Sequence, residues 1–316
     1  DVYKRQGILE LNKKKRFTDL KKNLPLLALT IPGMLYLLIN NYFPMFGVFI
    51  AFKDLDYSKG IFGSDWCGLK NFEFLFRTSE AGRMIRNTIL YNLVFIILGT
   101  VLAVLVALLM SEITHMTISK FYQGSMILPN LISMVIVSYI VYAFLSPETG
   151  LLNAVIKSFG GEPISWYSKK EAWPFILVIV QMWKTVGYNS IVYIAAITGI
   201  DPSLYEAARI DGAGKFKQIF RVTLPQLKPM ITLMILMSCG RIFSSDFGLF
   251  YQVPQNSGAL YSVTQTIDTY VYRGLMQLGD VGMSSAAGLF QSVVGFLFVF
   301  GANAIVRATN KENALF

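Results

Sequence analysis

The chain has 316 residues, of which 54% are hydrophobic and only 15% are charged, and its formal net charge is +9. Soluble domains carry about 25% charged residues, so this composition excludes an ordinary soluble globular protein. It indicates a protein embedded in a membrane. The basic excess then needs no nucleic-acid partner, because cations gather at the ends of membrane spans.

Long apolar stretches follow one another along the chain, and each exceeds the roughly 20 residues that a helix needs to cross a bilayer. Two stretches are interrupted by charges, with Lys184 in the fourth and Arg241 and Asp246 in the fifth. Lipid offers no hydrogen-bond partners to the backbone, so spans of this length are expected to be helical. The sequence therefore predicts an all-α membrane protein with six transmembrane helices, at residues 24–52, 87–111, 121–147, 172–200, 229–253 and 281–306.

Cations crowd into the segment before the first span, where residues 13–22 include six Lys or Arg. The excess of cations on cytoplasmic segments places this basic tail, 1–23, in the cytoplasm. Six spans then return the C-terminal tail, 308–316, to the same side, and the segments 112–120 and 201–228 also face the cytoplasm. The first span is too long for a cleavable signal peptide, so none is expected.

Residues typical of catalysis or metal binding are scarce. The two cysteines and the single histidine lie far apart in the predicted topology, so no disulfide framework or metal site is expected. Residues 212–215 read Gly-Ala-Gly-Lys, which is similar to part of a phosphate-binding loop. However, Arg209 occupies the first glycine position and Phe216 replaces the residue that would hold magnesium. The chain is therefore expected to bind no cofactor directly and to be no enzyme.

The polar segment 201–228 carries clear signals for a short helix. Asp201 is a good N-cap, and Pro202 suits the first helical position. Gly212 can adopt the left-handed conformation that ends a helix. Between them, Ala207 and Ala208 give a surface of little bulk that another protein can approach closely. An amphipathic connector lying on lipid headgroups is the plain alternative.

The spacing in this segment is specific. It reads Glu206-Ala207-Ala208-x3-Gly212-x9-Val222-x-Leu224-Pro225. This resembles the EAA loop (EAA-x3-G-x9-I-x-LP) of permease subunits in binding-protein-dependent ABC importers, with Val in place of Ile as the one departure. The resemblance implies a MetI-like ABC importer permease fold, in which this loop docks into a groove on the ATPase subunit. The implied ATPase-coupling residues are Glu206, Ala207, Ala208, Asp211, Gly212, Leu224 and Pro225.

Further segments extend the resemblance over residues 24–307, which are expected to form one permease domain. Residues 282–287, entering the last span, are similar to the corresponding segment of MalF-type sugar permeases. Residues 246–252 and 270–274 are similar to a subgroup that handles oligosaccharides from plant or algal polysaccharides. The first external loop is only about 35 residues long, whereas the maltose-system subunit has a large inserted domain, so maltose itself is not implied.

The resemblance implies the membrane subunit of an ATP-driven importer of sugars in the bacterial cytoplasmic membrane. Its implied partners are a second homologous permease, two ATP-hydrolysing subunits and an extracytoplasmic solute-binding protein. Two alternatives remain open, namely an ABC importer permease for another small solute, such as an amino acid or a polyamine, and an ion-coupled secondary transporter. A membrane enzyme is disfavoured because no nucleophile or metal cluster is evident.

The intramembrane charges suggest a substrate path. Charges at membrane depth cost about 2.5–3.5 kcal/mol each on insertion scales, so they are expected to face a cavity or each other. One interpretation is structural, with Asp246 bridging Lys184 or Arg241. The other is that a cation lines the permeation cavity, where its excess positive charge would suit an acidic sugar and aromatic rings would stack on the sugar. The residues of this candidate path are Lys184, Tyr188, Arg241, Phe243, Asp246 and Phe247.

Overall fold

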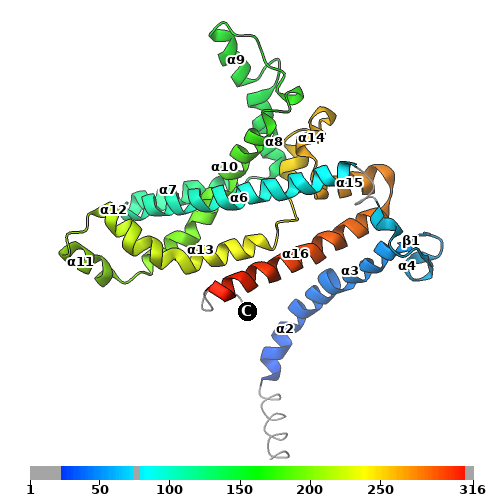
Figure 1. The fold of residues 1–316 in the computed structure, drawn as a ribbon, viewed down its shortest axis with the longest axis horizontal. Coiled ribbons are helices and arrows are strands. Elements are labelled where there is room, and N and C mark those ends of the chain that lie inside the picture. The colour runs from blue at the N-terminus through cyan, green and yellow to red at the C-terminus, as the bar shows by residue number, and fades with distance from the viewer. Residues whose placement is uncertain (1–22, 74–78, 310–316) are drawn as a thin grey trace, which may run out of the picture.

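The structure, a computed structural model, describes residues 23–73 and 79–309. The predicted tails 1–23 and 308–316 therefore lie almost entirely outside the described residues. Helices α6, α7, α13 and α16 run along the long axis of the molecule (Figure 1), and α10 packs against α6, α7 and α13. The longest helices are α6 (Ser79–Ser111), α7 (Met116–Leu131), α10 (Trp173–Thr198), α13 (Leu224–Cys239) and α16 (Val281–Thr309).

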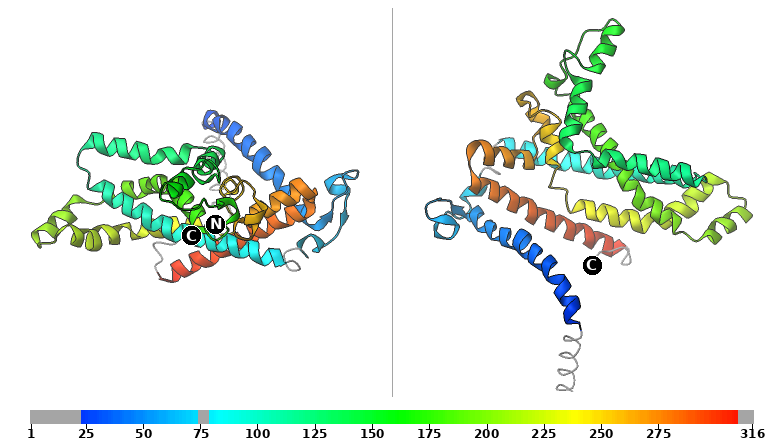
Figure 2. Two further views of the ribbon diagram at one scale, coloured as in Figure 1. Left: turned by 90° about the horizontal axis from the view of Figure 1, so that it is seen from above. Right: turned by 180° about the vertical axis from the view of Figure 1, so that it is seen from behind.

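Shorter elements lie at the two ends of these helices and in a projecting arm. At one end are α11 (Pro202–Ile210) and α12 (Lys215–Gln218). At the other end is α15 (Ile267–Leu278), preceded by α14 (Tyr261–Thr264). The arm consists of α8 (Met134–Leu145) and α9 (Leu151–Ser158), and it rises away from the long helices in both side views (Figures 1 and 2).

Five helical stretches among the described residues are long and apolar enough to cross a membrane. A sixth span is present if the bent pair α7 and α8 counts as one. The predicted all-helical membrane fold is thus confirmed, with the third span broken rather than straight. The five stretches are Leu24–Phe52, Glu80–Ser111, Trp173–Thr198, Lys215–Cys239 and Val281–Ala308.

The break in the third span is sharp, since α7 and α8 meet at an angle of 94°. Pro129 lies near the end of α7, and Ile132 and Ser133 adopt extended backbone conformations. The Ser133 hydroxyl accepts a hydrogen bond from the Ile136 amide at 3.4 Å and so caps the new helix. The prediction of one helix over 121–147 was wrong because this proline and serine cap divide it.

Lys184 of α10 satisfies the backbone groups that this break exposes. Its ammonium group is buried and donates to the carbonyl oxygens of Pro129 and Asn130, both at 3.2 Å, and to that of Ile132. The last carbonyls of a helix lack intrahelical partners and carry partial negative charge, so a cation is favourable there. The predicted bridge between Lys184 and Asp246 is therefore wrong, because Lys184 serves as the C-terminal cap of α7.

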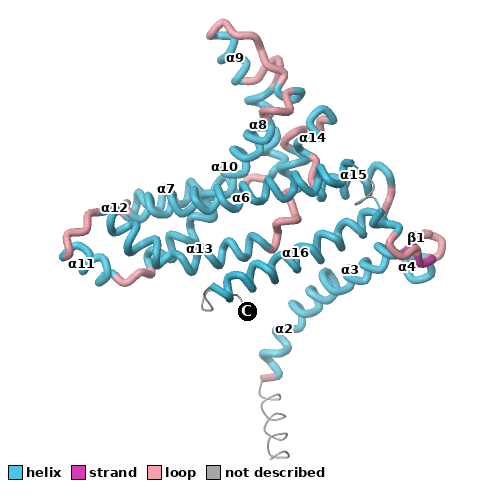
Figure 3. The backbone as a smooth tube through the Cα atoms, in the orientation of Figure 1, coloured by secondary structure: helices cyan, strands magenta, loops and turns pink. Residues whose placement is uncertain are grey.

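The fifth span is also displaced from its predicted position. Helix α13 ends at Cys239, so Arg241 and Asp246 lie in a non-helical stretch, residues 240–246, instead of inside a helix. Figure 3 shows this stretch as the loop that leaves the end of α13. Polar side chains from three other helices hold this stretch, which we call the break segment. Asn92 of α6 donates to the carbonyls of Ile242 and Ser244, both at 2.9 Å.

The other two supports of the break segment come from α15 and α16. Asp268 accepts hydrogen bonds from the Ser245 amide at 2.6 Å and the Ser245 hydroxyl at 2.8 Å. Gln291 donates to the Phe243 carbonyl at 2.8 Å. Irregular backbone in a membrane protein persists only where protein groups or water replace the lost helical bonds, and these side chains provide that replacement.

Among the described residues, three π-helical turns each lie just before a proline. They are η1 (Leu38–Tyr42), η5 (Ile219–Thr223) and η6 (Gly248–Gln252), and each ends two residues before a proline. Proline has no amide hydrogen, and its ring crowds the carbonyl four residues earlier. A locally widened turn relieves this conflict without ending the helix. This explains how the predicted loop residues Leu224 and Pro225 come to lie in a helical stretch that begins at Lys215.

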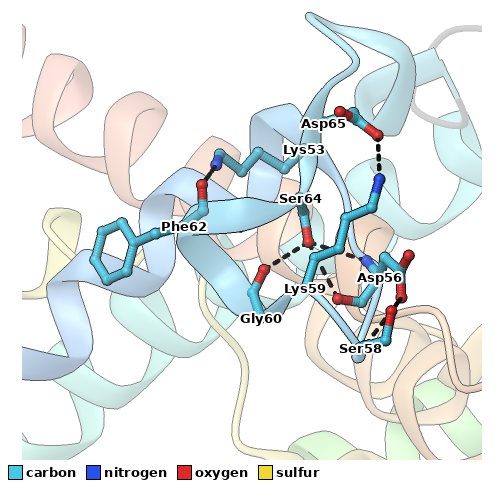
Figure 4. A network of polar contacts seen from close by, with 8 residues as sticks. All are labelled: Lys53, Asp56, Ser58, Lys59, Gly60, Phe62, Ser64 and Asp65. Carbon is cyan, nitrogen blue, oxygen red and sulfur yellow. Dashed lines mark hydrogen bonds and ion pairs between the residues drawn. The ribbon is translucent and has the colours of Figure 1, made fainter.

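The first span continues through α2 (Leu24–Leu37), α3 (Phe43–Met45) and η2 (Phe46–Phe52) into a small hairpin (Figure 4). Strands β1 (Lys53–Asp54) and β2 (Asp65–Trp66) pair antiparallel around α4 (Gly60–Gly63), and η3 (Lys70–Phe72) follows. Lys53 donates to the Phe62 carbonyl at 2.8 Å, and Ser64 donates to that of Gly60 at 2.6 Å. Outside the spans, this hairpin is a small exception to the predicted all-α fold.

Small residues allow the long helices to pack closely. Ala103 and Ala107 of α6 are fully buried in a cluster with Tyr193 and Ile197 of α10. These two alanines lie four residues apart and form a face of small side chains that packs against α10. At Gly187 of α10, a Cβ atom would overlap the backbone of α7, so only glycine permits this close approach.

We expect Lys184→Met to destabilise the protein, because it leaves the terminal carbonyls of α7 without donors. Each unsatisfied buried group costs about 1–3 kcal/mol, so thermal unfolding of the purified protein in detergent is expected at a clearly lower temperature. Lys228→Met removes an exposed cation from α13 and serves as the control, with little change expected. Equal stability of the two variants would contradict the capping role.

Candidate functional site

The segment 201–228 lies at one end of the molecule, where α11 and α12 project beyond the long helices (Figures 1 and 2). Helix α11 begins as predicted, because the Asp201 carboxylate accepts a hydrogen bond from the Ser203 amide at 2.9 Å and Pro202 occupies the first turn. This backbone hydrogen bond, together with one from the Ser203 hydroxyl, holds the pKa of Asp201 below its ordinary value.

Helix α11 also ends as predicted. Gly212 has a φ of +73°, in the left-handed region, and the Ala213 amide donates to the Ala208 carbonyl at 2.8 Å. This geometry closes the helix with its last carbonyls satisfied. Asp211 occupies the preceding position and is exposed. A β-branched residue at position 212 would be strained by this backbone conformation.

Two contacts brace the segment internally, and a third ties it to the end of α6. The Tyr205 and Thr223 hydroxyl oxygens are 3.0 Å apart and join α11 to η5. Gln218 donates to the Ala213 carbonyl at 2.7 Å. Lys215 forms an ion pair with Glu112 at the end of α6. The segment is therefore a short, braced lever rather than a loose connector.

The outer surface of this lever is apolar and unpartnered within the described chain. Glu206 and Ala207 are exposed, and Ala208 is half-buried. Ile210 and Phe216 are 87% and 80% exposed. Large apolar side chains exposed in a cluster mark a surface that another protein or a membrane covers. Of the remaining predicted coupling residues, Leu224 is half-buried and Pro225 is exposed.

A cavity of about 290 Å³ lies between α6, α10 and α13. Arg241, from the start of the break segment, is the only charged residue in its lining, and this side chain is exposed. The Oε1 atom of Gln181 is buried without a hydrogen-bond partner among the described residues. The cavity therefore offers both a cation and a free acceptor. Its polar lining includes Asn92, Gln181, Thr185, Asn189, Ser238 and Arg241.

Of the six residues predicted to form a substrate path, only Arg241 lies in the lining of this cavity. Lys184 caps α7, as described above. Tyr188 is 53% exposed and Phe243 is buried beside α16. Asp246 forms no ion pair with Arg241, and its carboxylate accepts from the Leu249 amide at 3.1 Å. Phe247 lies further along, where it stacks on Tyr251 at 4.7 Å between ring centroids.

The sequence reasoning missed the polar stripe on α10. Gln181, Thr185 and Asn189 follow one another at four-residue spacing within an apolar span. Such spacing places them on one helix face, and all three line the cavity. The four-residue spacing is present in the sequence and is the signal that could have predicted this polar face. Asn92, by contrast, is a single polar residue in α6 whose partners could not be identified without the structure.

Comparison with known proteins identifies the family. Residues 96–311 match the family described as binding-protein-dependent transport system inner membrane component. The polygalacturonan/rhamnogalacturonan transport system permease protein YteP of Bacillus subtilis (strain 168) is 33% identical over 287 residues, which cover 91% of this chain and 89% of that protein. Protein LplB of the same organism is 34% identical over 293 residues, covering 93% and 92% respectively.

The fold agrees with these sequence matches. A chain from the crystal structure of a bacterial ABC transporter involved in the import of the acidic polysaccharide alginate superposes with a TM-score of 0.84. The identity is 32%, and the match covers 94% of this chain and 99% of that chain. The predicted ABC importer permease fold is confirmed. The chain therefore belongs to the family of binding-protein-dependent transport system inner membrane components.

Proposed function

We propose that this protein is the translocation subunit of an ATP-driven importer of oligosaccharides that contain uronate residues. The observation that carries the proposal is the polar cavity between α6, α10 and α13, with Arg241 as its only charged lining residue. Its hydroxyl, amide and guanidinium groups suit the hydroxyls and carboxylates of an acidic sugar. The names of two similar proteins, which refer to polygalacturonan and alginate, support the same substrate class.

The alternative substrates fit this cavity less well. A polyamine is cationic and would be repelled by Arg241, for which the cavity lining holds no carboxylate. A neutral oligosaccharide could use the polar stripe on α10 but would leave the charge of Arg241 uncompensated. Family membership disfavours an ion-coupled secondary transporter, because members of this family work with a separate binding protein.

We propose that ATP hydrolysis by partner subunits moves the braced lever formed by residues 201–228. Partner ATPase subunits would dock on the exposed face that includes Glu206, Ala207 and Ile210. Asp211 and Gly212 shape the turn at the end of this face, and Leu224 and Pro225 join it to α13. Displacement of the lever would then move α10 and α13, which both line the cavity. The remaining proposed partners are a second homologous permease and an extracytoplasmic solute-binding protein.

The proposed orientation puts both termini and the lever in the cytoplasm. It rests on the basic N-terminal tail and on six spans. The hairpin of β1 and β2, the arm tip at α9 and helix α15 would then lie on the outer side. ATP is consumed in the cytoplasm, so the docking face must lie there if the coupling proposal is correct.

The transport proposal is tested by uptake in vesicles that contain the whole complex and its binding protein. We expect ATP-dependent uptake of a galacturonate oligosaccharide, and we expect Arg241→Gln to reduce it about tenfold or more, since a charge-assisted hydrogen bond contributes about 1.5–3 kcal/mol. Lys228→Gln, which removes an exposed cation outside the cavity, is the matched control. Uptake that needs no ATP, or an Arg241→Gln variant as fast as the control, would contradict the proposal.

The coupling proposal predicts that Ala207→Trp abolishes the stimulation of ATP hydrolysis by the loaded binding protein. Ala207 is exposed, so the change leaves the fold intact while a bulky ring obstructs docking, where overpacking costs about 1–3 kcal/mol. Ser203→Trp, on the same helix and also exposed, tests whether any bulk on α11 suffices. Normal stimulation in the Ala207 variant would show that this face is not the docking surface.

The orientation proposal predicts which positions react with a membrane-impermeant thiol reagent. In a background without Cys67 and Cys239, a cysteine replacing Ser158 at the end of α9 is expected to react in sealed cells. A cysteine replacing Lys217 in the lever is expected to react only after the membrane is opened. Both side chains are exposed, so accessibility within the protein does not limit the reaction. Labelling of position 217 in sealed cells would contradict the proposed orientation and place the lever outside.

A further inference from the structure

Arg273 of α15 is a buried cation with unused hydrogen-bonding capacity. Its side chain is 8% exposed, and its Nε donates to the Asn256 Oδ1 atom at 3.2 Å. The guanidinium carbon lies 3.9 Å from the centre of the Tyr261 ring. Its two terminal nitrogens, Nη1 and Nη2, are buried and have no hydrogen-bond partner among the described residues.

This arrangement is unfavourable for a purely structural arginine. Burial lowers the pKa of Arg273 from its ordinary value, yet the guanidinium keeps its charge because arginine does not lose its proton in proteins. A buried charge normally has an opposite charge or a full set of acceptors. Here no carboxylate of the described chain forms an ion pair with Arg273. Two parallel nitrogens facing the same way match the two oxygens of a carboxylate.

Aromatic rings stand beside this cation. Phe247 and Tyr251 are stacked with their ring centroids 4.7 Å apart, and Tyr272 lies 4.5 Å from Phe247 and 5.1 Å from Tyr251. All three rings are partly exposed. Against the effect of burial, Tyr261, Tyr251 and Glu80 each raise the pKa of Arg273, so Tyr251 lies near this cation. The ring faces can pack on the apolar face of a sugar, while the neighbouring arginine takes its acidic group.

These residues come from two segments that the sequence singled out separately, 246–252 and 270–274, and the structure joins them. They also adjoin the break segment, because Phe247 immediately follows its last residue, Asp246, while Arg241 near its start lines the cavity. A sugar bound at the aromatic rings would therefore lie at the end of the break segment opposite to Arg241.

A small cover closes over the guanidinium group. Asn256 has a φ of 47° and follows Gln255, which has a φ of 55°, and both values are uncommon for residues other than glycine. The Tyr261 hydroxyl donates to the Asn256 Oδ1 atom at 3.1 Å, the same atom that receives the Arg273 Nε–H. Asn256 and Tyr261 are partly exposed, so their displacement would open a route to the buried nitrogens.

We propose that Arg273 is a carboxylate-recognition site that binds a uronate residue of the oligosaccharide before it reaches the cavity, with Phe247, Tyr251 and Tyr272 holding the sugar ring. The proposal rests on the proposed function, since it takes α15 to lie on the outer side and the substrate to be acidic. Asn256 and Tyr261 form the cover that the carboxylate displaces. The site selects for acidic sugars at entry, separately from Arg241 in the cavity.

The test compares uptake of a galacturonate oligosaccharide with uptake of its carboxyl-reduced, neutral form of the same length. The complete complex is used, in vesicles, with binding protein in excess. Arg273→Gln is expected to lower the preference for the acidic sugar by about tenfold or more, with uptake of the neutral form unchanged. Lys169→Gln removes an exposed cation from another segment predicted to be external, and its preference is expected to equal that of the wild type.

A second variant keeps the proposal testable if Arg273→Gln fails to assemble. Asn256→Asp retains the acceptor oxygen for the Arg273 Nε and for Tyr261 but adds a negative charge beside the guanidinium. This internal carboxylate competes with the substrate, so the same loss of preference is expected in a protein at least as thermally stable as the wild type. An unchanged preference in an assembled variant of either kind would overturn the proposal.

The remaining outcomes separate this site from its alternatives. If Arg273→Gln reduces uptake of the acidic and neutral sugars equally, the carboxylate belongs to a partner protein and the uronate site is refuted. If wild-type vesicles import neither sugar, the proposed function itself fails. If they import the acidic sugar and the variants do so with the same preference, transport stands and only the role of Arg273 is lost.

Discussion

The structure depends on one requirement, that backbone groups exposed where an apolar helix breaks or ends find partners from the protein. The third span is broken between α7 and α8, and the fifth ends at Cys239. Side chains from neighbouring helices match the irregular backbone at both places. Lys184 takes the carbonyls at the end of α7, and Asn92, Asp268 and Gln291 hold the break segment. Polar residues at membrane depth are costly unless they are paired in this way. The positions of these residues therefore determine where the chain can leave the helical path.

The breaks also explain how a bundle of apolar helices contains a polar cavity. A continuous α13 would extend past residue 240 and keep Arg241 within a regular helix. Because α13 ends at Cys239, the chain turns and places Arg241 in the cavity lining, facing the polar stripe of α10. The same turn brings Phe247 to the rings of Tyr251 and Tyr272. The end of the fifth span at Cys239 thus shapes two adjacent polar regions.

The sequence predicted the helical class, the number of spans when the bent pair counts as one, and the local structure of the lever, since length, capping residues and Gly212 act locally. It failed where distant residues decide the outcome. Lys184 was expected to face a cavity or Asp246, but the carbonyls that it caps belong to residues 52 to 55 positions earlier, at a break that no periodicity revealed. The end of α13 depends on partners from α6, α15 and α16 and was likewise misplaced. The charged residues marked the fourth and fifth predicted spans as irregular, but their contacts could not be predicted from the sequence.

Helix α10 has a consequence for how the protein can move. One face carries Gln181, Thr185 and Asn189 into the cavity, and another clamps the end of α7 through Lys184. Sliding α10 along its axis by a single turn, about 5.4 Å, would pull that ammonium group away from all of its acceptors. Helices α7 and α10 must therefore travel as one rigid body during any rearrangement. The bending has to be absorbed at joints outside this pair, and the short connection from Gly199 to Asp201, which leads into α11, is such a joint.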